Sequence, residues 1–392
     1  MEYKIGFWNY VETGVLDPEK AVEDWKALGM NTPMSFDFDP EKHDKKGMLS
    51  ALDVCEKNGM KMIVCDARTT FRRLKEIGKE KFVQDVTNAS RDFASHPAFF
   101  GFHVGDEPDK EMFPYAEEAY RIVKEAAPNS VPFINFLPFW EGEDFAECLC
   151  PDLESYADML DRFVKNTGAA MISYDCYAHC AYFEREKYVD IYFRNLRLFG
   201  TVARNNGIEL CNCPCCVGHW MLVVPDEDLL RWQINTSVTH GVTGLMYFFV
   251  YERTLDGSYR LPPIDLFWER TEMFPRLSRQ NRIFNSFFAE PMSGLTLCDI
   301  RHFGTRTYGG FPQFEPNEDI GKIEFAVNPV PMSITKYKDA RGTTVYAVVN
   351  LSQNEPTAVS FTCGNGFERY SMLHRMAPGQ LMLLTKSGED HE

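Results

Sequence analysis

The sequence lacks any run of 18 or more apolar residues, the length that a membrane-spanning helix needs. Its first residues, MEYKIGFWNYVETG, have no basic segment followed by an apolar stretch and so predict no secretory signal peptide. Positive charge is scarce, because 41 Lys and Arg face 57 Asp and Glu, a formal net charge of −16. An acidic surface repels phosphate backbones and acidic lipids. We therefore expect a cytoplasmic protein that binds neither nucleic acid nor membranes, with homo-oligomers left open.

Motifs of several common enzyme classes are also missing. The segment GFWNYVETG, at the end of the first predicted strand, is not the glycine-rich loop that binds phosphate in dinucleotide-binding folds. No Ser-His-Asp order and no obvious metal triad follow the predicted strands. We therefore expect no cofactor and no resident metal ion.

Cysteine, in contrast, is plentiful. Six of the 12 cysteines fall in the segments YDCYAHC and ELCNCPCCVGH, namely Cys176, Cys180, Cys211, Cys213, Cys215 and Cys216. Thiolates are ligands of zinc and other soft metals, so a metal site is one interpretation. The spacing C-x-C-x-C-C would place three thiols along one face of a strand, too extended to surround one ion. Buried, uncharged thiols in the core are therefore the favoured interpretation, with the metal site kept as an alternative.

Short apolar runs alternate with amphipathic stretches over residues 1–290. Eight strands are predicted, at residues 3–9, 32–38, 61–65, 99–104, 131–136, 170–174, 208–213 and 244–250. Helices follow them, and the last is expected over residues 265–288. Eight strand–helix units predict an α/β fold, a (β/α)₈ TIM barrel. A doubly wound open sheet is the competing fold, which the missing phosphate loop disfavours.

The composition changes after Pro291. Short strands separated by turn residues replace the helical period, and they predict a small all-β sandwich over residues 291–388. The expected strands are residues 323–325, 332–338, 343–350, 357–361, 371–376 and 380–385.

Candidate functional residues are those at the carboxyl ends of the barrel strands, where TIM barrels carry their chemistry. The substrate-binding candidates are Trp8, Asn9, Asp66, Arg68, His103, Asp106, Asn135, Tyr174, Tyr177, Trp220 and Tyr251. Aromatic faces stack on sugar C–H surfaces, while carboxylates and amides bind hydroxyl groups. This combination of acids and aromatic side chains favours a carbohydrate as the substrate.

The segment FFGFHVGDEP, residues 99–108, carries the strongest signal. Strand alternation places Gly101, His103, Gly105 and Glu107 on one face, and the two glycines are expected to leave space beside Glu107. A carboxyl group with room above it at the end of a strand suits general acid–base catalysis. The alternative is that the acidic residues before Pro108 only cap the next helix.

FFGFHVGDEP resembles the fourth-strand segment of clan A glycoside hydrolases, in which Asn-Glu-Pro carries the acid/base glutamate. The segments ISYDCY, LLRWQINTSVTHG and GVTGLMYFF resemble family 42 β-galactosidase-like proteins, and APGQLMLL is similar to the end of their small β domain. The resemblance implies a retaining (β/α)₈ glycosidase with Glu107 as acid/base. Two departures are evident: Asp106 replaces the usual Asn, and the seventh strand ends in CNCPCCVGHW without the expected nucleophilic glutamate.

A second catalytic carboxylate must then come from another strand. Asp175 ends the sixth predicted strand and Glu252 follows the eighth, so either could serve. Separations of about 5–5.5 Å and about 6.5–9.5 Å between the two carboxyl groups would predict retention and inversion, respectively. A carbohydrate-binding protein that has lost catalysis and a metal-dependent barrel enzyme using the cysteines are the alternative functions.

Overall fold

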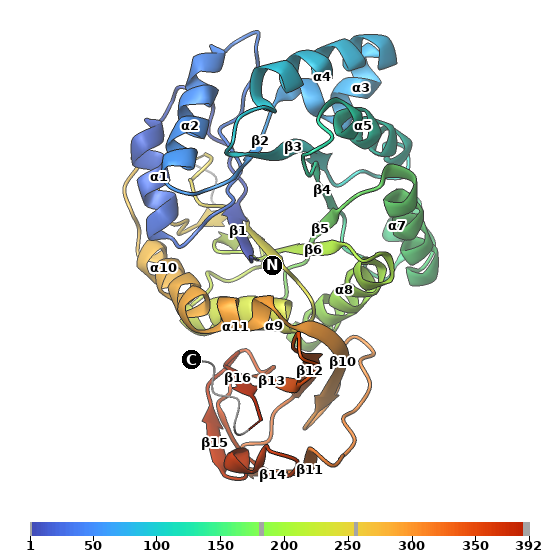
Figure 1. Ribbon diagram of the computed structural model, residues 1–392, viewed down its shortest axis with the longest axis vertical. Helices are drawn as coiled ribbons and strands as arrows, with labels where there is room; N and C mark the ends of the chain where they lie inside the picture. The colour runs from blue at the N-terminus through green and yellow to red at the C-terminus, as the bar shows by residue number, and fades with distance from the viewer. Residues whose placement is uncertain (1, 180–183, 255–257, 387–392) are drawn as a thin grey trace.

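The computed structural model describes residues 2–179, 184–254 and 258–386. Seven parallel strands form one curled sheet in the order β1-β8-β6-β5-β4-β3-β2 (Figure 1). These strands are β1 (Lys4–Phe7), β2 (Met62–Val64), β3 (Phe99–Asp106), β4 (Phe133–Phe136), β5 (Met171–Asp175), β6 (Glu209–Cys213) and β8 (Gly244–Tyr247). Their side chains are largely buried, which explains why each reads as a short apolar run.

The gap between β1 and β2 is closed by residues 32–38, the second predicted strand, which run as irregular extended chain. The Met34 N–H donates to the Phe7 carbonyl at 3.2 Å, and the Ser35 N–H donates to the Ile63 carbonyl at 2.8 Å. These bonds join the segment to both neighbours, so eight chain segments surround one core. The predicted TIM barrel is confirmed.

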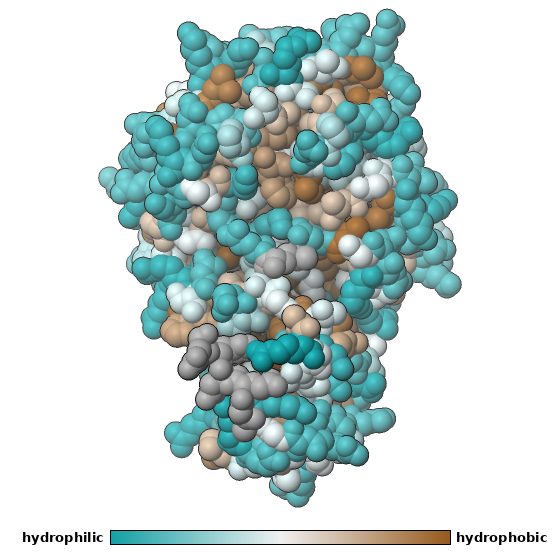
Figure 2. Space-filling model, in the orientation of Figure 1, coloured by the Kyte–Doolittle hydropathy of each residue, from teal (hydrophilic) through white to brown (hydrophobic). Residues whose placement is uncertain are grey.

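Helices surround the strands (Figure 1). They are α1 (Pro18–Ala27), α2 (Lys45–Lys57), α3 (Phe71–Ile77), α4 (Lys79–Phe93), α5 (Phe113–Ala126), α6 (Glu143–Cys148), α7 (Leu153–Thr167), α8 (Arg185–Asn206), α9 (Glu227–Thr239), α10 (Met273–Phe284) and α11 (Glu290–Ser293), with short η1 (Ala67–Thr69) and η2 (Asn285–Ala289). None of the helices in the described part of the chain is both long and apolar enough to cross a membrane. The face seen in Figure 2 is mainly hydrophilic, in keeping with the large number of charged residues.

The last barrel helix begins later than residue 265, where the sequence predicted it. The carboxylate of Asp265 accepts the N–H groups of Phe267 and Glu269 at 2.8 and 3.0 Å, and Trp268 has a positive φ of 63°. These bonds hold the segment in turns, because a side chain that captures nearby N–H groups competes with the helix. The helix α10 begins only at Met273.

The second domain is a sandwich of two antiparallel sheets. One sheet contains β10 (Thr296–Phe303), β12 (Met332–Lys338), β13 (Thr344–Asn350) and β16 (Leu381–Leu384), and the other contains β11 (Ile320–Val327), β14 (Thr357–Cys363) and β15 (Leu373–Met376). Buried side chains from both sheets, including Ile334, Val348, Val359 and Phe361, form its core. Strand β10 was not predicted, because a bulge between Leu297 and Asp299 and the buried His302 interrupt its apolar alternation.

Helix α9 lies between the barrel and the sandwich and fixes one to the other (Figure 1). Trp232 donates its indole N–H to the Leu351 carbonyl at 2.8 Å, and Asn235 donates to the Gly379 carbonyl at 2.8 Å. At Gly379, which has a φ of 64°, a Cβ would lie 2.4 Å from the Trp232 Cα. Only glycine allows this approach, so the backbones of the two domains are in direct contact at this point.

The cysteines around β6 are buried thiols. Cys211, Cys213, Cys215 and Cys216 are each at most 1 % exposed, and Cys215 and Cys216 donate to the backbone carbonyls of Val217 and Phe249. Within residues 2–179, 184–254 and 258–386, the one group with metal-binding geometry contains no cysteine, and it is Asp53, Glu56 and His96 at the surface. Cys180 lies outside the described residues.

Candidate active site

Glu107 is held at the rim by the sharp exit of the chain from β3. The Glu107 N–H donates to the Asn135 carbonyl at 2.9 Å, and its φ of 47° turns the side chain away from the strand direction. A left-handed conformation in a non-glycine residue stores strain that clusters at functional sites. Glu107 is therefore fixed by its backbone as well as by its side-chain contacts.

Gly101 and Gly105, the two glycines of β3, do not leave the open space that was predicted beside Glu107. A Cβ at Gly101 would lie 1.9 Å from the Val131 carbonyl oxygen, and one at Gly105 would lie 2.2 Å from the Phe71 ring. The expectation that they leave open space beside Glu107 is wrong. They permit close packing of the backbone against Val131 and of Phe71 against the strand, and this packing supports the segment that carries Glu107.

Asn135, on β4, connects three strands beneath the site. Its amide group Nδ2 donates to Asp106 Oδ1 at 3.1 Å and to Asp175 Oδ1 at 2.7 Å. Its Oδ1 accepts the Ser173 hydroxyl at 2.9 Å and the Cys213 thiol at 3.5 Å. The strand register makes this possible, because Asn135 pairs with Asp106 on one side and Ser173 on the other. Both aspartates are thereby held in place.

The carboxyl groups of Glu107 and Asp175 are hydrogen-bonded to each other. Burial, followed by the charges of Asp175 and Asp106, raises the pKa of Glu107 to about 9. Burial and the charge of Asp175 raise the pKa of Asp106 to about 7, and burial also raises the pKa of Asp175. A hydrogen bond between two carboxyl groups needs a proton, so the pair shares one at neutral pH, and Glu107 is the group that holds it.

A cavity of about 500 Å³ opens above these carboxyl groups. Its walls are largely aromatic, and the residues that line it include Trp8, Tyr10, Asp106, Glu107, Asn135, Trp140, Asp175, Tyr177, Tyr188, His219, Trp220 and Phe248. Trp220 is 74 % exposed and forms the outer edge of the cavity. Convergent polar groups inside an aromatic cavity of this size are typical of a small-molecule site.

A second cavity, of about 420 Å³, adjoins the first and shares Trp8, Tyr10 and Asp106 with it. Asn9, Asp66 and His103 line this second cavity. The Nδ2 atom of Asn9 and the Nε2 atom of His103 are buried without hydrogen-bond partners in the structure. The Asn9 amide can therefore donate to an acceptor of a ligand, and His103 Nε2 can donate or accept according to its tautomer.

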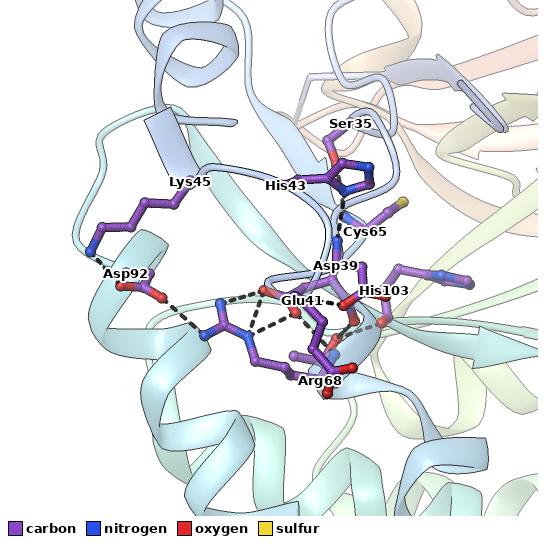
Figure 3. Close-up of polar contacts among 11 residues, drawn as sticks. Ser35, Asp39, Glu41, His43, Lys45, Cys65, Arg68, Asp92 and His103 are labelled. Atoms are coloured by element: carbon purple, nitrogen blue, oxygen red, sulfur yellow. Dashed lines mark hydrogen bonds and ion pairs between the residues drawn. The ribbon is translucent and has the colours of Figure 1, made fainter. Parts of the chain in front are cut away.

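Arg68 lines neither cavity. It forms ion pairs with Asp66 at 2.8 Å and with Asp92 at 3.0 Å, and Lys45 contacts Asp92 at 2.8 Å. Figure 3 shows the Arg68 guanidinium directed toward Asp92, with Lys45 on the far side of that carboxylate. Arg68 thus acts on the second cavity only through Asp66, which it orients.

Three other candidates also line neither cavity. The ring of Tyr174 is buried between the strands and the surrounding helices. It stacks on the ring of Phe199, with the two ring centroids 4.1 Å apart. The Tyr251 hydroxyl accepts the Trp25 indole N–H at 2.8 Å inside the core. Glu252 donates its backbone N–H to the Ile264 carbonyl, and its side chain is not among those that line either cavity.

Some cavity residues were not proposed from the sequence as site residues. Tyr188 and Ile191 reach the cavity from α8, and Phe248 follows β8. The spacing of the first two by three residues places them on one helix face, which was the available signal. That signal does not show that the first turns of α8 project over the barrel mouth.

No family model matches the chain, and no curated protein sequence matches it. Solved structures do share its fold. One is a glycoside hydrolase family 5 protein from Bacteroides vulgatus, with a TM-score of 0.62 and 10 % sequence identity. The alignment covers 99 % of this chain and 90 % of the Bacteroides vulgatus chain. The β-galactosidases of Marinomonas ef1 and Rahnella sp. R3 align with 74 % and 76 % of this chain, with TM-scores of 0.54 and 0.55 and 11 % identity.

The chain spans 62 % and 58 % of the lengths of those two β-galactosidases. At 10–11 % identity the likeness establishes the fold alone, a (β/α)₈ barrel. The likeness does not single out family 42.

Proposed function

We propose that this protein is a glycoside hydrolase that cleaves a small oligosaccharide or glycoside, with Glu107 as general acid and base. The observation that carries the proposal is the hydrogen-bonded Glu107–Asp175 carboxyl pair beneath an aromatic cavity, where burial and neighbouring charges raise the pKa of Glu107 to about 9. Acid catalysis of glycoside cleavage at neutral pH needs a carboxyl group that keeps its proton there. The barrel fold shared with known glycoside hydrolases supports the same reaction class.

Each group has a defined task in this proposal. Glu107 donates its proton to the glycosidic oxygen as the bond to the anomeric carbon breaks. Asp175 and Asp106 then repel the new charge on Glu107, so Glu107 readily takes a proton back from the attacking water. Asn135 holds both aspartates, while Trp8 and Tyr177 provide faces for the sugar ring.

The test is turnover of aryl glycosides by wild type and by Glu107→Gln. Removal of a general acid costs about 10²–10⁴-fold in rate when the leaving group needs protonation. We expect a loss of that size in kcat/KM, which reports the bond-breaking step, with phenyl glycosides and a much smaller loss in kcat/KM with dinitrophenyl glycosides, whose leaving group departs as an anion. Glu125→Gln, an exposed substitution on α5, is the matched control and should retain wild-type rates.

Equal losses with both leaving groups, or none with either, would refute the role of Glu107. A wild-type protein that binds sugars and hydrolyses none would instead support the carbohydrate-binding alternative. That alternative draws on one specific observation, the absence of a carboxylate at the end of β6.

A further inference from the structure

The carboxyl groups of Glu107 and Asp175 are too close together to act from opposite sides of a sugar. Within the described ranges, only Asp106, Glu107 and Asp175 contribute carboxyl groups to its lining. Glu107 is hydrogen-bonded to Asp175, and Asn135 binds both aspartates. Retaining and inverting pairs stand about 5–5.5 Å and about 6.5–9.5 Å apart, whereas hydrogen-bonded carboxyl oxygens are about 2.5–3.0 Å apart. A sugar ring cannot lie between Glu107 and Asp175.

No side chain at the end of β6 replaces the missing nucleophile. Cys213 occupies that place, is fully buried, and accepts the Trp8 indole N–H at 3.3 Å. Burial raises the pKa of the Cys213 thiol well above its usual range, which keeps it neutral, and Cys213 does not line the cavity. Glu252 does not line the cavity either. Asp175, Cys213 and Glu252 are therefore each unsuited to be the nucleophile that displaces the leaving group.

We propose that the substrate supplies it: the protein hydrolyses β-glycosides of 2-acetamido-2-deoxy sugars, whose own acetamido oxygen attacks the anomeric carbon while Asp175 binds the acetamido N–H. The inference rests on the proposed glycosidase function. It assigns Glu107 as the acid and Asp175 as the positioning residue, and it fixes the substrate class. Substrate-assisted catalysis of this kind needs one acid and one N–H acceptor side by side, as Glu107 and Asp175 are.

The step balances with these groups alone. The acetamido carbonyl oxygen forms a bond to the anomeric carbon, and the bond from that carbon to the glycosidic oxygen breaks. The electron pair of the broken bond stays on the glycosidic oxygen, which receives the Glu107 proton. Asp175 faces the positive charge of the oxazolinium ring that results. Water then attacks the anomeric carbon, gives its proton to Glu107, and the ring opens to the free 2-acetamido sugar with its configuration retained.

The surroundings of Asp175 suit this task. In the resting protein its carboxyl group is bonded to Asn135, Glu107 and Tyr177, so it is already fixed in direction. When Glu107 engages the glycosidic oxygen, the contact of Asp175 with Glu107 is released and one carboxylate oxygen becomes available to an N–H donor. Ile191 and Leu222 line the same cavity and offer apolar contacts for the acetamido methyl group.

The substrate class can be tested with paired 4-nitrophenyl glycosides. The 2-acetamido-2-deoxy β-gluco- and β-galactosides are compared with the β-glucoside and β-galactoside that carry a 2-hydroxyl group. A built-in nucleophile acts at a high effective concentration, so we expect kcat/KM to favour the acetamido substrates by at least about 1,000-fold. Replacing the acetyl group by mono-, di- and trifluoroacetyl should lower kcat stepwise, because fluorine withdraws electrons from the attacking oxygen.

Asp175 is tested by Asp175→Asn, with Asp158→Asn, an exposed substitution on α7, as the control. Loss of one preorganised electrostatic contact costs about 10²–10³-fold in kcat. We expect that loss for the acetamido substrates, a steeper dependence on fluorination, and weaker calorimetric binding of the corresponding 2-methylthiazoline sugar. A purely structural role would leave the dependence on fluorination unchanged.

The outcomes separate the two proposals. Substrate assistance would be overturned if the 2-hydroxyl glycosides were hydrolysed as fast as the acetamido glycosides, or if the rate did not change with fluorination. Either result would leave the proposed glycosidase function unaffected. An Asp175→Asn variant with an unchanged fluorination slope would overturn the role of Asp175. A protein that hydrolyses none of the glycosides and binds no thiazoline would overturn both.

Discussion

Replacing Glu107 with glutamine should stabilise the fold at neutral and alkaline pH, although it removes the proposed acid. Burial and the neighbouring aspartates raise the pKa of Glu107 to about 9, from 4.5. The folded protein therefore holds a proton that the unfolded chain releases above about pH 4.5. The stability that this proton provides is fully present below pH 4.5 and is lost as the pH rises toward 9. Glutamine keeps a buried donor for Asp175 and carries no proton to lose.

The size of the effect follows from the interval between the two pKa values. A pH of 7.5 lies three units above the pKa of Glu107 in the unfolded chain. Ionisation of Glu107 therefore stabilises the unfolded state of wild type by about 4 kcal/mol, at about 1.4 kcal/mol per unit. Imperfect hydrogen bonding of the buried glutamine amide offsets part of this, and about 1–3 kcal/mol is the usual range for such a penalty. We therefore expect Glu107→Gln to be more stable than wild type by about 2 kcal/mol at pH 7.5 and less stable by about 1 kcal/mol at pH 5, where the gain is smaller than the amide penalty.

Thermal unfolding at pH 5, 6, 7 and 8 provides the measurement. One kcal/mol shifts Tm by roughly 2–4 °C in a domain of 150–250 residues. The difference in Tm between Glu107→Gln and wild type should grow with pH to a few degrees, while Glu125→Gln follows wild type throughout. A difference that stays constant with pH, or one that shrinks as the pH rises, would refute the elevated pKa of Glu107.

Three further predictions concern other parts of the chain. Gly105→Ala should lower the free energy of unfolding, measured in urea, by about 3 kcal/mol, because the new Cβ would lie 2.2 Å from a carbon of the Phe71 ring and the φ of residue 105 is 148°. A variant as stable as wild type would contradict this. Burial lowers the pKa of His240 to about 3 and that of His302 well below its usual range, and their Nε2 atoms are 3.1 Å apart. Stability present above about pH 6.5 should therefore fall as the pH drops toward 3, and a His302→Phe variant should lose less of its Tm between pH 7 and pH 4 than wild type does. Iodoacetamide should modify exposed Cys298 in the native protein and reach Cys213 only in denaturant, as peptide mass spectrometry would detect; native labelling of Cys213 would refute its assignment as an inert thiol.

The barrel could be predicted because its strands are buried on both faces and read as continuous apolar runs. The failures have local causes. Asp265 captures N–H groups that a helix would otherwise use, and this delays α10 to Met273. In β10 a bulge between Leu297 and Asp299 and the fully buried polar residue His302 break the alternation that a half-buried strand should show.

The candidate site was predictable only one strand at a time. The rule that chemistry lies at strand ends gave Asp106, Glu107, Asn135 and Asp175, all of which line the cavity. The same rule gave Tyr174, which alternation places on the opposite face from Asp175 and which packs against α8. The contact between Glu107 and Asp175 depends on strand register and on a positive φ at Glu107, which no local pattern in the sequence specifies.

The cysteine at the end of β6 is a consequence of how Asn135 is oriented. Two carboxyl groups contact its Nδ2, so only its Oδ1 can face Cys213 and Ser173, and both of these donate to it. A glutamate at position 213 would direct an acceptor at that Oδ1 and would add a fourth carboxyl group to a fully buried place. An amide that binds both aspartates thus disfavours a carboxylate at the end of β6. The same hydrogen bonds that exclude the carboxylate fix Asp175 beside Glu107, the arrangement in which the substrate's acetamido group can take over its task.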